Sequence, residues 1–126
     1  MTKESRPANE KTALVADDST DIRALVARLL VARGWRVHTC GDGLSAIQLL
    51  DEYRFDAVIA DLGMPGTAGS RLLEYALSVH SGAKLCLMSG WPESWARRHA
   101  ERLGATILGK PFRAAELYEA VGEAAD

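Results

Sequence analysis

Short apolar runs and longer segments of helical periodicity alternate along the chain. In four runs the apolar residues are mainly consecutive rather than alternating, which is typical of strands buried on both faces of a parallel sheet: 12–16, 55–60, 84–88 and 105–108. A fifth run, 35–40, alternates between apolar and polar residues, as an edge strand does. The pattern therefore predicts five strands, the second of which lies at an edge of the sheet.

Each run is followed by a segment whose apolar residues recur every three or four positions. The helices expected from this periodicity cover 21–33, 45–52, 70–79, 94–103 and 113–124. Gly34 and Gly104 directly follow the first and fourth segments, where glycine commonly ends a helix. Five strand–helix units in succession predict an α/β fold with a doubly wound five-stranded parallel sheet and helices on both faces.

Composition and charge exclude several classes of protein. The 126 residues suffice for one domain, which we expect over 12–126, and the polar segment 1–11 is expected to be a flexible arm. A net charge of -2 gives no basic field for nucleic acid or an anionic membrane, and no apolar stretch approaches the length of a membrane span. Three arginines are interpreted as the solvated face of the fourth helix rather than a docking site: Arg97, Arg98 and Arg102.

The cysteines and histidines show no ligand spacing. Cys40 and Cys86 stand singly in apolar segments, so neither a disulfide framework nor a zinc site is expected, and a reducing cytoplasm fits. We expect both cysteines in the core. His38, His80 and His99 are expected at the surface.

Reactive side chains stand at the ends of four predicted strands. Asp17 and Asp18 follow the first, Asp61 the third, Ser89 the fourth and Lys110 the fifth. Ligands of open α/β sheets bind outside the carboxyl edge, where parallel strands all end. In the flavodoxin-like order 2-1-3-4-5, the first and third strands are neighbours, which would bring the three aspartates together.

Three carboxylates at close range repel one another, and a single lysine cannot offset them all. A hard divalent cation with oxygen ligands relieves this repulsion, and Mg²⁺ suits a site that keeps waters and accepts a phosphate oxygen. A carboxylate facing a metal-bound phosphoryl group can act as a nucleophile and become an aspartyl phosphate.

Four blocks of the sequence resemble the receiver domains of two-component response regulators. They are Asp17-Asp18, the stretch DLGMPGTAG over 61–69, Met88-Ser89-Gly90 and Lys110-Pro111-Phe112. The spacing between the blocks is also that of the family, and the resemblance extends from about residue 11 to 124. One block alone is a weak signal, whereas four in order at strand ends are specific.

The resemblance implies roles for these residues. Asp61 would accept the phosphoryl group. Asp18 and Asp61 would bind Mg²⁺ (or Mn²⁺) directly, together with the main-chain carbonyl of Gly63, and Asp17 would reach the metal through water. This is chemistry by positioning and charge neutralisation.

Further roles concern the phosphorylated state. Lys110 would pair with the phosphoryl oxygens as a compact charge, and the hydroxyl of Ser89 would donate a hydrogen bond to the phosphoryl group. Gly90 would leave the room that this group needs. Pro111 is expected to follow a cis peptide bond, as in relatives.

Two positions depart from the family pattern. Relatives usually have Tyr or Phe where this chain has Ile107, which predicts an altered or muted switch because isoleucine is stiff and carries no hydroxyl. Trp91 stands where relatives often have a smaller or polar residue. It either shields the aspartyl phosphate from water or packs on the surface beside Trp95, and both interpretations stay open.

The function implied is a phosphorylation-controlled signalling switch rather than a turnover enzyme. A histidine kinase or histidine phosphotransfer protein would supply the phosphoryl group, docking on the first helix near Asp17. The downstream partner would be a protein, with no direct nucleic acid binding. The chain is either a stand-alone response regulator or the receiver of a hybrid histidine kinase.

Other classes of protein share parts of this pattern. An aspartate-nucleophile phosphohydrolase carries DxD on its first strand, where this chain has Asp17-Asp18-Ser19. A flavin-binding electron carrier would need a phosphate-binding loop after the first strand, where this chain has the acidic residues Asp17 and Asp18 instead. A degenerate receiver that acts only as a protein-binding module is disfavoured by the complete set of residues: Asp17, Asp18, Asp61, Ser89 and Lys110.

Overall fold

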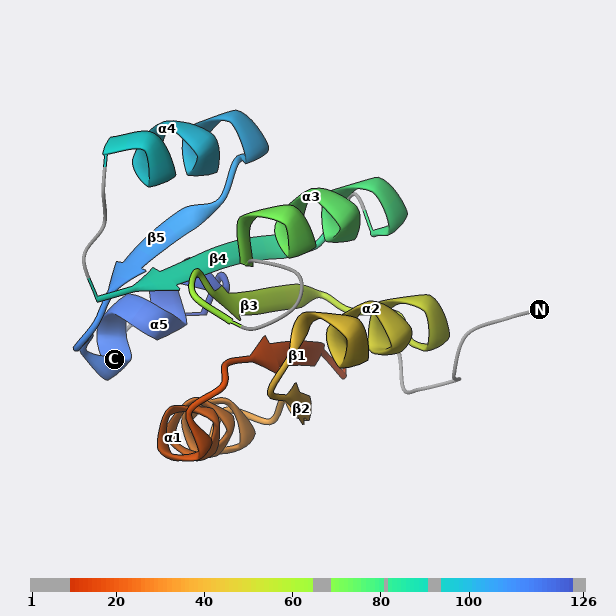
Figure 1. Ribbon diagram of the computed structural model, residues 1–126. Helices are drawn as coiled ribbons and strands as arrows, with labels where there is room; N and C mark the ends of the chain where they lie inside the picture. Colours follow the sequence, from red (N-terminus) through yellow and green to blue (C-terminus); the bar gives the residue numbers. More distant parts are fainter. Residues whose placement is uncertain (1–9, 65–68, 81, 91–93, 124–126) are drawn as a thin grey trace.

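A computed structural model describes residues 10–64, 69–80, 82–90 and 94–123 of the chain. It shows one five-stranded sheet in the order β2-β1-β3-β4-β5, with every neighbouring pair parallel (Figure 1). The strands are β1 (Thr12–Ala16), β2 (Arg36–Cys40), β3 (Ala57–Asp61), β4 (Lys84–Ser89) and β5 (Thr106–Gly109). The predicted strand order is therefore confirmed.

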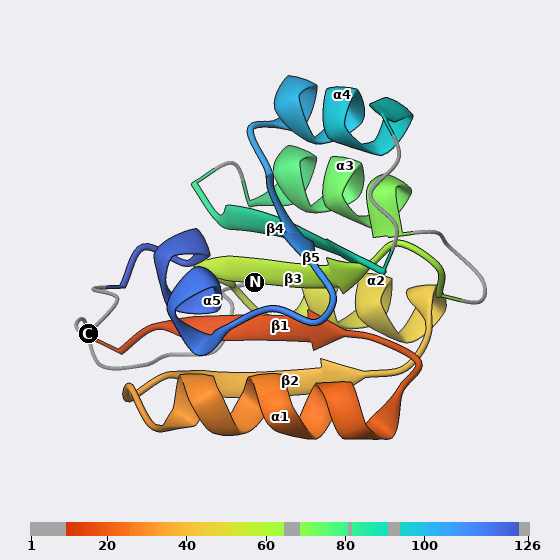
Figure 2. The same cartoon turned by 90° about the vertical axis from the view of Figure 1, so that its left-hand side faces the viewer.

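Five helices connect the strands and cover both faces of the sheet. They are α1 (Thr20–Val31), α2 (Gly43–Glu52), α3 (Gly69–Val79), α4 (Ser94–Leu103) and α5 (Ala114–Ala120). Helices α1 and α5 lie on one face, and α2, α3 and α4 lie on the other (Figures 1 and 2). The arrangement confirms the doubly wound fold. Within the described segments, no helix combines the length and apolar character that crossing a bilayer requires.

Alternation of side chains along the strands creates two cores. In β1, Leu14 and Ala16 belong to the core beneath α2, α3 and α4, whereas Ala13 and Val15 belong to the core beneath α1 and α5. All four residues are fully buried. Because burial of a leucine side chain contributes about 1.5–3 kcal/mol, both faces of β1 favour apolar residues. This explains why the strand reads as an unbroken apolar run.

Glycines end three of the helices. Gly34, Gly104 and Gly122 have φ of 87°, 71° and 86°, a region that favours glycine. Gly104 confirms the predicted end of the fourth helix at 103, whereas α1 ends at Val31, two residues before the predicted end at 33. Gly122 shows that the expected end of the last helix at 124 was wrong: α5 ends at Ala120, and the Glu123 N–H donates back to the Tyr118 carbonyl at 2.8 Å.

Polar caps explain why α1 and α2 begin earlier than the periodicity predicts. The Ser19 hydroxyl accepts a hydrogen bond from the Ile22 N–H at 3.3 Å, so α1 starts at Thr20. The Asp42 carboxylate accepts one from the Ser45 N–H at 2.7 Å, so α2 starts at Gly43. Both side chains satisfy N–H groups that a helix start otherwise leaves unpaired.

The edge strands are more exposed than the central ones. β2 lies at an edge as predicted. The expectation that both cysteines lie in the core holds for Cys86 but was wrong for Cys40, which is half-buried on this edge strand. β5 occupies the other edge, so the expectation that it is buried on both faces was wrong: Thr106 is exposed and Ile107 is half-buried. An apolar run alone does not distinguish an edge strand flanked by two helices from a central strand.

The histidines are half-buried rather than surface groups, which corrects the prediction. His38 stacks on Tyr53 with the ring centroids 4.4 Å apart. The His80 Nε2 lies 2.9 Å from the Leu50 carbonyl oxygen. His99 belongs to α4, and its Nε2 lies 3.4 Å from a carboxylate oxygen of Glu74 on α3.

Candidate functional site

The carboxyl ends of the strands bring the predicted site residues to one edge of the sheet, toward which the arrowheads in Figure 2 point. Ala16 of β1 lies opposite Ala60 of β3 in the pairing register. The residues that follow, Asp17 and Asp61, are therefore neighbours. Asp61 is the last residue of β3.

Three carboxylates form a compact acidic cluster at this edge. One oxygen from each of Asp17, Asp18 and Asp61 lies within 4.8 Å of the other two. Asp17 is fully buried, Asp61 is 8% exposed and Asp18 is exposed. The structure thus brings the three aspartates together as expected, with Asp18 on the solvent side.

Lys110 bridges two members of the acidic cluster. Its Nζ donates to Asp17 Oδ2 at 2.8 Å and to Asp61 Oδ1 at 2.7 Å. Burial acts to lower the pKa of the Lys110 ammonium, but its hydrogen bonds to the two carboxylates outweigh burial, and the net pKa is raised. The ammonium is therefore charged at neutral pH. The Lys110–Pro111 peptide bond is cis, as the resemblance implies.

Main-chain donors orient the two buried carboxylates. The Ser19 N–H donates to Asp17 Oδ1 at 2.8 Å, and the Gly63 N–H donates to Asp61 Oδ2 at 3.2 Å. Each carboxylate thus has one oxygen on a main-chain N–H and the other on the Lys110 ammonium. Such charge-assisted bonds hold an acceptor in a defined orientation.

Ser89 is the last residue of β4 and lies next to this cluster along the sheet edge. It is 5% exposed, and its main-chain carbonyl accepts a hydrogen bond from the Lys110 N–H at 2.7 Å. Gly90 is exposed, and a Cβ built on it would meet no heavy atom of the described residues within 4 Å. Trp91 lies outside the described residues, as do 65–68 of the second block.

Gly69 has a steric role that periodicity does not reveal. A Cβ at this position would lie 2.2 Å from the main-chain oxygen of Asp61 and 2.7 Å from its carbonyl carbon. Only glycine therefore lets α3 begin against the main chain that carries Asp61. In the sequence, Gly69 stands out only as the last residue of the stretch over 61–69. That position does not reveal the close contact that requires a glycine.

The composition of the acidic cluster fits a hard divalent cation. It offers only carboxylate oxygens, and three negative charges face one ammonium. Asp17 and Asp61 are bonded to Lys110, whereas the Asp18 side chain has no hydrogen bond or ion pair among the described residues. Oxygen ligands with excess negative charge are what Mg²⁺ and Mn²⁺ prefer.

Ile107 occupies the position where the family pattern has an aromatic ring. It pairs with Leu87 of β4 and packs against the core beneath α2, α3 and α4. Because it is half-buried, its side chain already has apolar contacts in this state. The expectation of a muted switch stays a prediction.

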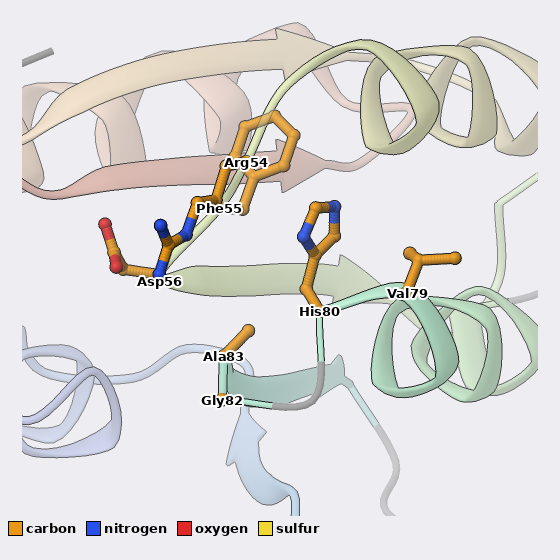
Figure 3. A pocket seen from close by; sticks show the side chains of 7 residues that line it. All are labelled: Arg54, Phe55, Asp56, Val79, His80, Gly82 and Ala83. Atoms are coloured by element: carbon orange, nitrogen blue, oxygen red, sulfur yellow. The ribbon is translucent and has the colours of Figure 1, made fainter. Parts of the chain in front are cut away.

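A cavity at the amino ends of the strands, opposite the acidic cluster, is lined by different side chains. It measures about 380 Å³ and lies between the segments that precede β3 and β4, where the rings of Phe55 and His80 come close together (Figure 3). Its carboxylate, Asp56, accepts a hydrogen bond from the Thr12 N–H at 2.9 Å. This places the acidic side chain in a strand-connecting role rather than in a cluster.

Comparison with known proteins identifies the class of protein that has this fold and this acidic site at the carboxyl edge of the sheet. The family model described as the response regulator receiver domain matches residues 13–122. The chain therefore belongs to the receiver-domain family of response regulators, a class of signalling domains that are generally not turnover enzymes.

Individual relatives agree with this membership. Sporulation initiation phosphotransferase F of Bacillus subtilis (strain 168) is 29% identical over 114 residues, which cover 90% of this chain and 91% of the relative. Sensor kinase CckA of Brucella abortus (strain 2308) is 30% identical over 89% of this chain but only 12% of that kinase. The solved structure of the chemotaxis response regulator CheY4 of Vibrio cholerae superposes with a TM-score of 0.79 at 26% identity, covering 88% of this chain and 95% of CheY4.

Proposed function

We propose that this chain is a phosphoacceptor receiver in which Asp61 takes a phosphoryl group from a phosphohistidine in a Mg²⁺-dependent reaction. The observation that carries the proposal is the Lys110 ammonium, which bridges Asp17 and Asp61 inside a cluster of three carboxylates within 4.8 Å. Such a cluster has the charge to hold a divalent cation and the nucleophile to accept phosphorus.

The chemical step transfers the phosphoryl group between two nucleophiles. A carboxylate oxygen of Asp61 forms the new P–O bond while the P–N bond of the phosphohistidine breaks, and the electron pair of that bond returns to the imidazole nitrogen. Lys110 holds a positive charge beside the phosphoryl oxygens. The Gly63 N–H keeps the Asp61 carboxylate oriented during the attack.

Four residues would hold the metal. Asp18, Asp61 and the main-chain carbonyl of Gly63 would be direct ligands, and Asp17 would act through water. When bound, Mg²⁺ (or Mn²⁺) supplies the positive charge that offsets the attacking carboxylate and the phosphoryl oxygens. The excess of negative charge in the acidic cluster supports this assignment.

The phosphorylated state would bias the protein toward a second conformation. The Ser89 hydroxyl would donate a hydrogen bond to the phosphoryl group, and Gly90 would leave room for it. The burial of Ser89 beside the Lys110 main chain supports this role, because a small shift there moves two strand ends together.

The donor would be a histidine kinase or a histidine phosphotransfer protein that docks on α1 near Asp17. The relatives named as a phosphotransferase and as a sensor kinase support a donor of this type. The receiver would occupy 12–126 with 1–11 as an arm. It would work alone or as part of a hybrid kinase, and it would act on a downstream protein rather than on nucleic acid or membrane.

Incubation with acetyl phosphate and Mg²⁺, followed by intact-mass measurement, tests the proposal. We expect one added phosphoryl group, lost in Asp61→Asn and in EDTA. Asp42→Asn is the matched control, because Asn caps α2 as well as Asp does. Failure of the wild-type protein to label would favour a protein-binding module, and steady release of phosphate from monoesters would favour a phosphohydrolase.

A further inference from the structure

Arg23 of α1 connects the helix to the main chain of the acidic cluster. Its Nη1 donates to the main-chain carbonyl oxygen of Asp17 at 2.7 Å, and its Nη2 donates to the Thr20 hydroxyl at 3.3 Å. The carbonyl that it holds belongs to the peptide unit between Asp17 and Asp18. One side chain therefore anchors the link between two members of the cluster.

Asp18 needs such an anchor because, in the part of the chain that the structure describes, nothing holds its side chain. Asp17 and Asp61 are held by Lys110 and by main-chain N–H groups, whereas the Asp18 carboxylate is exposed and makes no hydrogen bond with the described residues. Its position is set by the main chain on either side of it. That main chain is held by Arg23 at the Asp17 carbonyl and by the Ser19 N–H, which donates to Asp17 Oδ1 at 2.8 Å.

Gly41, which follows β2, lies directly against the guanidinium of Arg23. A Cβ on Gly41 would lie 2.8 Å from Arg23 Nη1, 3.6 Å from its Cζ and 3.8 Å from the Asp17 carbonyl oxygen. Gly41 is not among the glycines with positive φ, so alanine would suit its backbone. The close approach thus depends on the guanidinium, and an alanine at 41 would displace the flexible end of Arg23.

We propose that Arg23, seated against Gly41, is a positioning residue that sets where Asp18 presents its carboxylate to a divalent cation. The inference rests on the proposed function insofar as the cation is Mg²⁺. Arginine suits the task because its planar fork reaches two acceptors at once, which a lysine ammonium on a flexible stem does less well. Partners that orient metal ligands typically affect metal affinity by about 10- to 100-fold.

The first experiment is a Mg²⁺ titration followed by thermal denaturation, with variants of α1. Arg23→Met keeps an apolar stem and removes both hydrogen bonds, and we expect it to raise the half-saturating Mg²⁺ concentration by about tenfold. Arg23→Lys should give an intermediate value. Arg28→Met, at an exposed position of the same helix, is the control and should stay within about twofold of wild type.

A double-mutant cycle separates positioning from a general loss of stability. Gly41→Ala should raise the half-saturating Mg²⁺ concentration in the wild-type background and have no effect on it in the Arg23→Met background. The inference is overturned by an unchanged Mg²⁺ requirement in Arg23→Met, or by an equal effect of Gly41→Ala in both backgrounds. A variant that merely loses stability would have a lower Tm in EDTA, but its effect on the Mg²⁺ requirement would not depend on the residue at position 23.

A metal-free readout distinguishes failure of this inference from failure of the proposed function. In EDTA, loss of the Arg23 anchor should speed hydrogen exchange at the Ser19 amide, which donates to Asp17. If wild-type protein shows no Mg²⁺ effect, the proposed function fails while faster Ser19 exchange in Arg23→Met still supports positioning. Unchanged Ser19 exchange in that variant overturns positioning in either case.

Discussion

Replacing Asp18 by asparagine should stabilise the metal-free protein and remove most of the stabilisation that Mg²⁺ provides. Asp18 is the informative member of the acidic cluster because its side chain makes no hydrogen bond with the described residues. Neutralising Asp17 or Asp61 would also remove an ion pair with Lys110. In Asp18→Asn, relief of repulsion is therefore not masked by a lost contact.

The magnitude follows from the geometry of the cluster. At the 4.8 Å limit between oxygens, each pair of carboxylates repels by about 0.9 kcal/mol at the dielectric constant of water and about 3.5 kcal/mol at an effective value of about 20. Asp18 is exposed, so the lower figure applies to each of its two pairs, about 1.7 kcal/mol in total, and the Lys110 charge cancels part of this. A net gain of about 1 kcal/mol remains, equivalent to about 4 °C in Tm for a domain of this size.

The assay is thermal denaturation in EDTA and in Mg²⁺. At about ten times its dissociation constant, Mg²⁺ should stabilise wild-type protein by about 1.4 kcal/mol, and Asp18→Asn should lose most of that gain. The matched control is Asp21→Asn in the first turn of α1. It loses a favourable interaction with the helix N-terminus, so its Tm should fall slightly while the Mg²⁺ gain stays.

The two effects of Asp18→Asn have opposite signs, which makes the reasoning easy to refute. A lower Tm in EDTA would mean that Asp18 contributes a favourable interaction rather than repulsion. An undiminished Mg²⁺ gain would mean that the cation does not use this carboxylate. Either outcome would contradict the electrostatic account of the acidic cluster.

Three further predictions concern other parts of the molecule. Gly69→Ala should cost about 2 kcal/mol in urea denaturation, because the added Cβ meets the Asp61 main chain; a cost below about 0.5 kcal/mol would contradict the close approach. Burial raises the pKa of Cys40 to about 11 and that of Cys86 to about 12, so at pH 8 the thiolate fraction of Cys40 is about 200-fold below that of a free cysteine. Iodoacetamide should label Cys40 only as the pH approaches 11, and rapid labelling at pH 8 would count against burial. With Ile107 in place of an aromatic ring, a beryllofluoride mimic should shift the amide resonances of α4 only slightly, and large two-state shifts there would refute a muted switch.

Local periodicity predicted much of the fold. Runs of mainly consecutive apolar residues identified β1, β3 and β4, because both faces of a central strand in a doubly wound sheet are buried. The same signal also located β5 but wrongly implied burial on both faces, because β5 is an edge strand with Thr106 exposed. Gly34 and Gly104 were readable as helix stops, whereas the caps Ser19 and Asp42 were missed because many serines and aspartates lie in loops without capping a helix.

The candidate site, like the fold, could be predicted from the sequence only in part. Asp17, Asp18, Asp61 and Lys110 could be placed together from the sequence, since parallel strands end at one edge and the strand order makes β1 and β3 neighbours. Their spacing could not show that Lys110 bonds two of the aspartates, whereas Asp18 is exposed and its side chain bonds to no residue that the structure describes. That depends on side-chain geometry at the meeting point of three strand ends.

The amino-acid sequence by itself determined the strand–helix alternation, the parallel sheet and the residues at its carboxyl edge, because these follow from periodicity and from the rules of sheet topology. Only the tertiary structure decided the contacts between loops, such as Gly41 against Arg23 and Gly69 against the main chain of Asp61. These contacts join segments distant in sequence at separations of a few ångströms. Periodicity reports which face a residue occupies, whereas such contacts depend on how two elements are placed relative to each other.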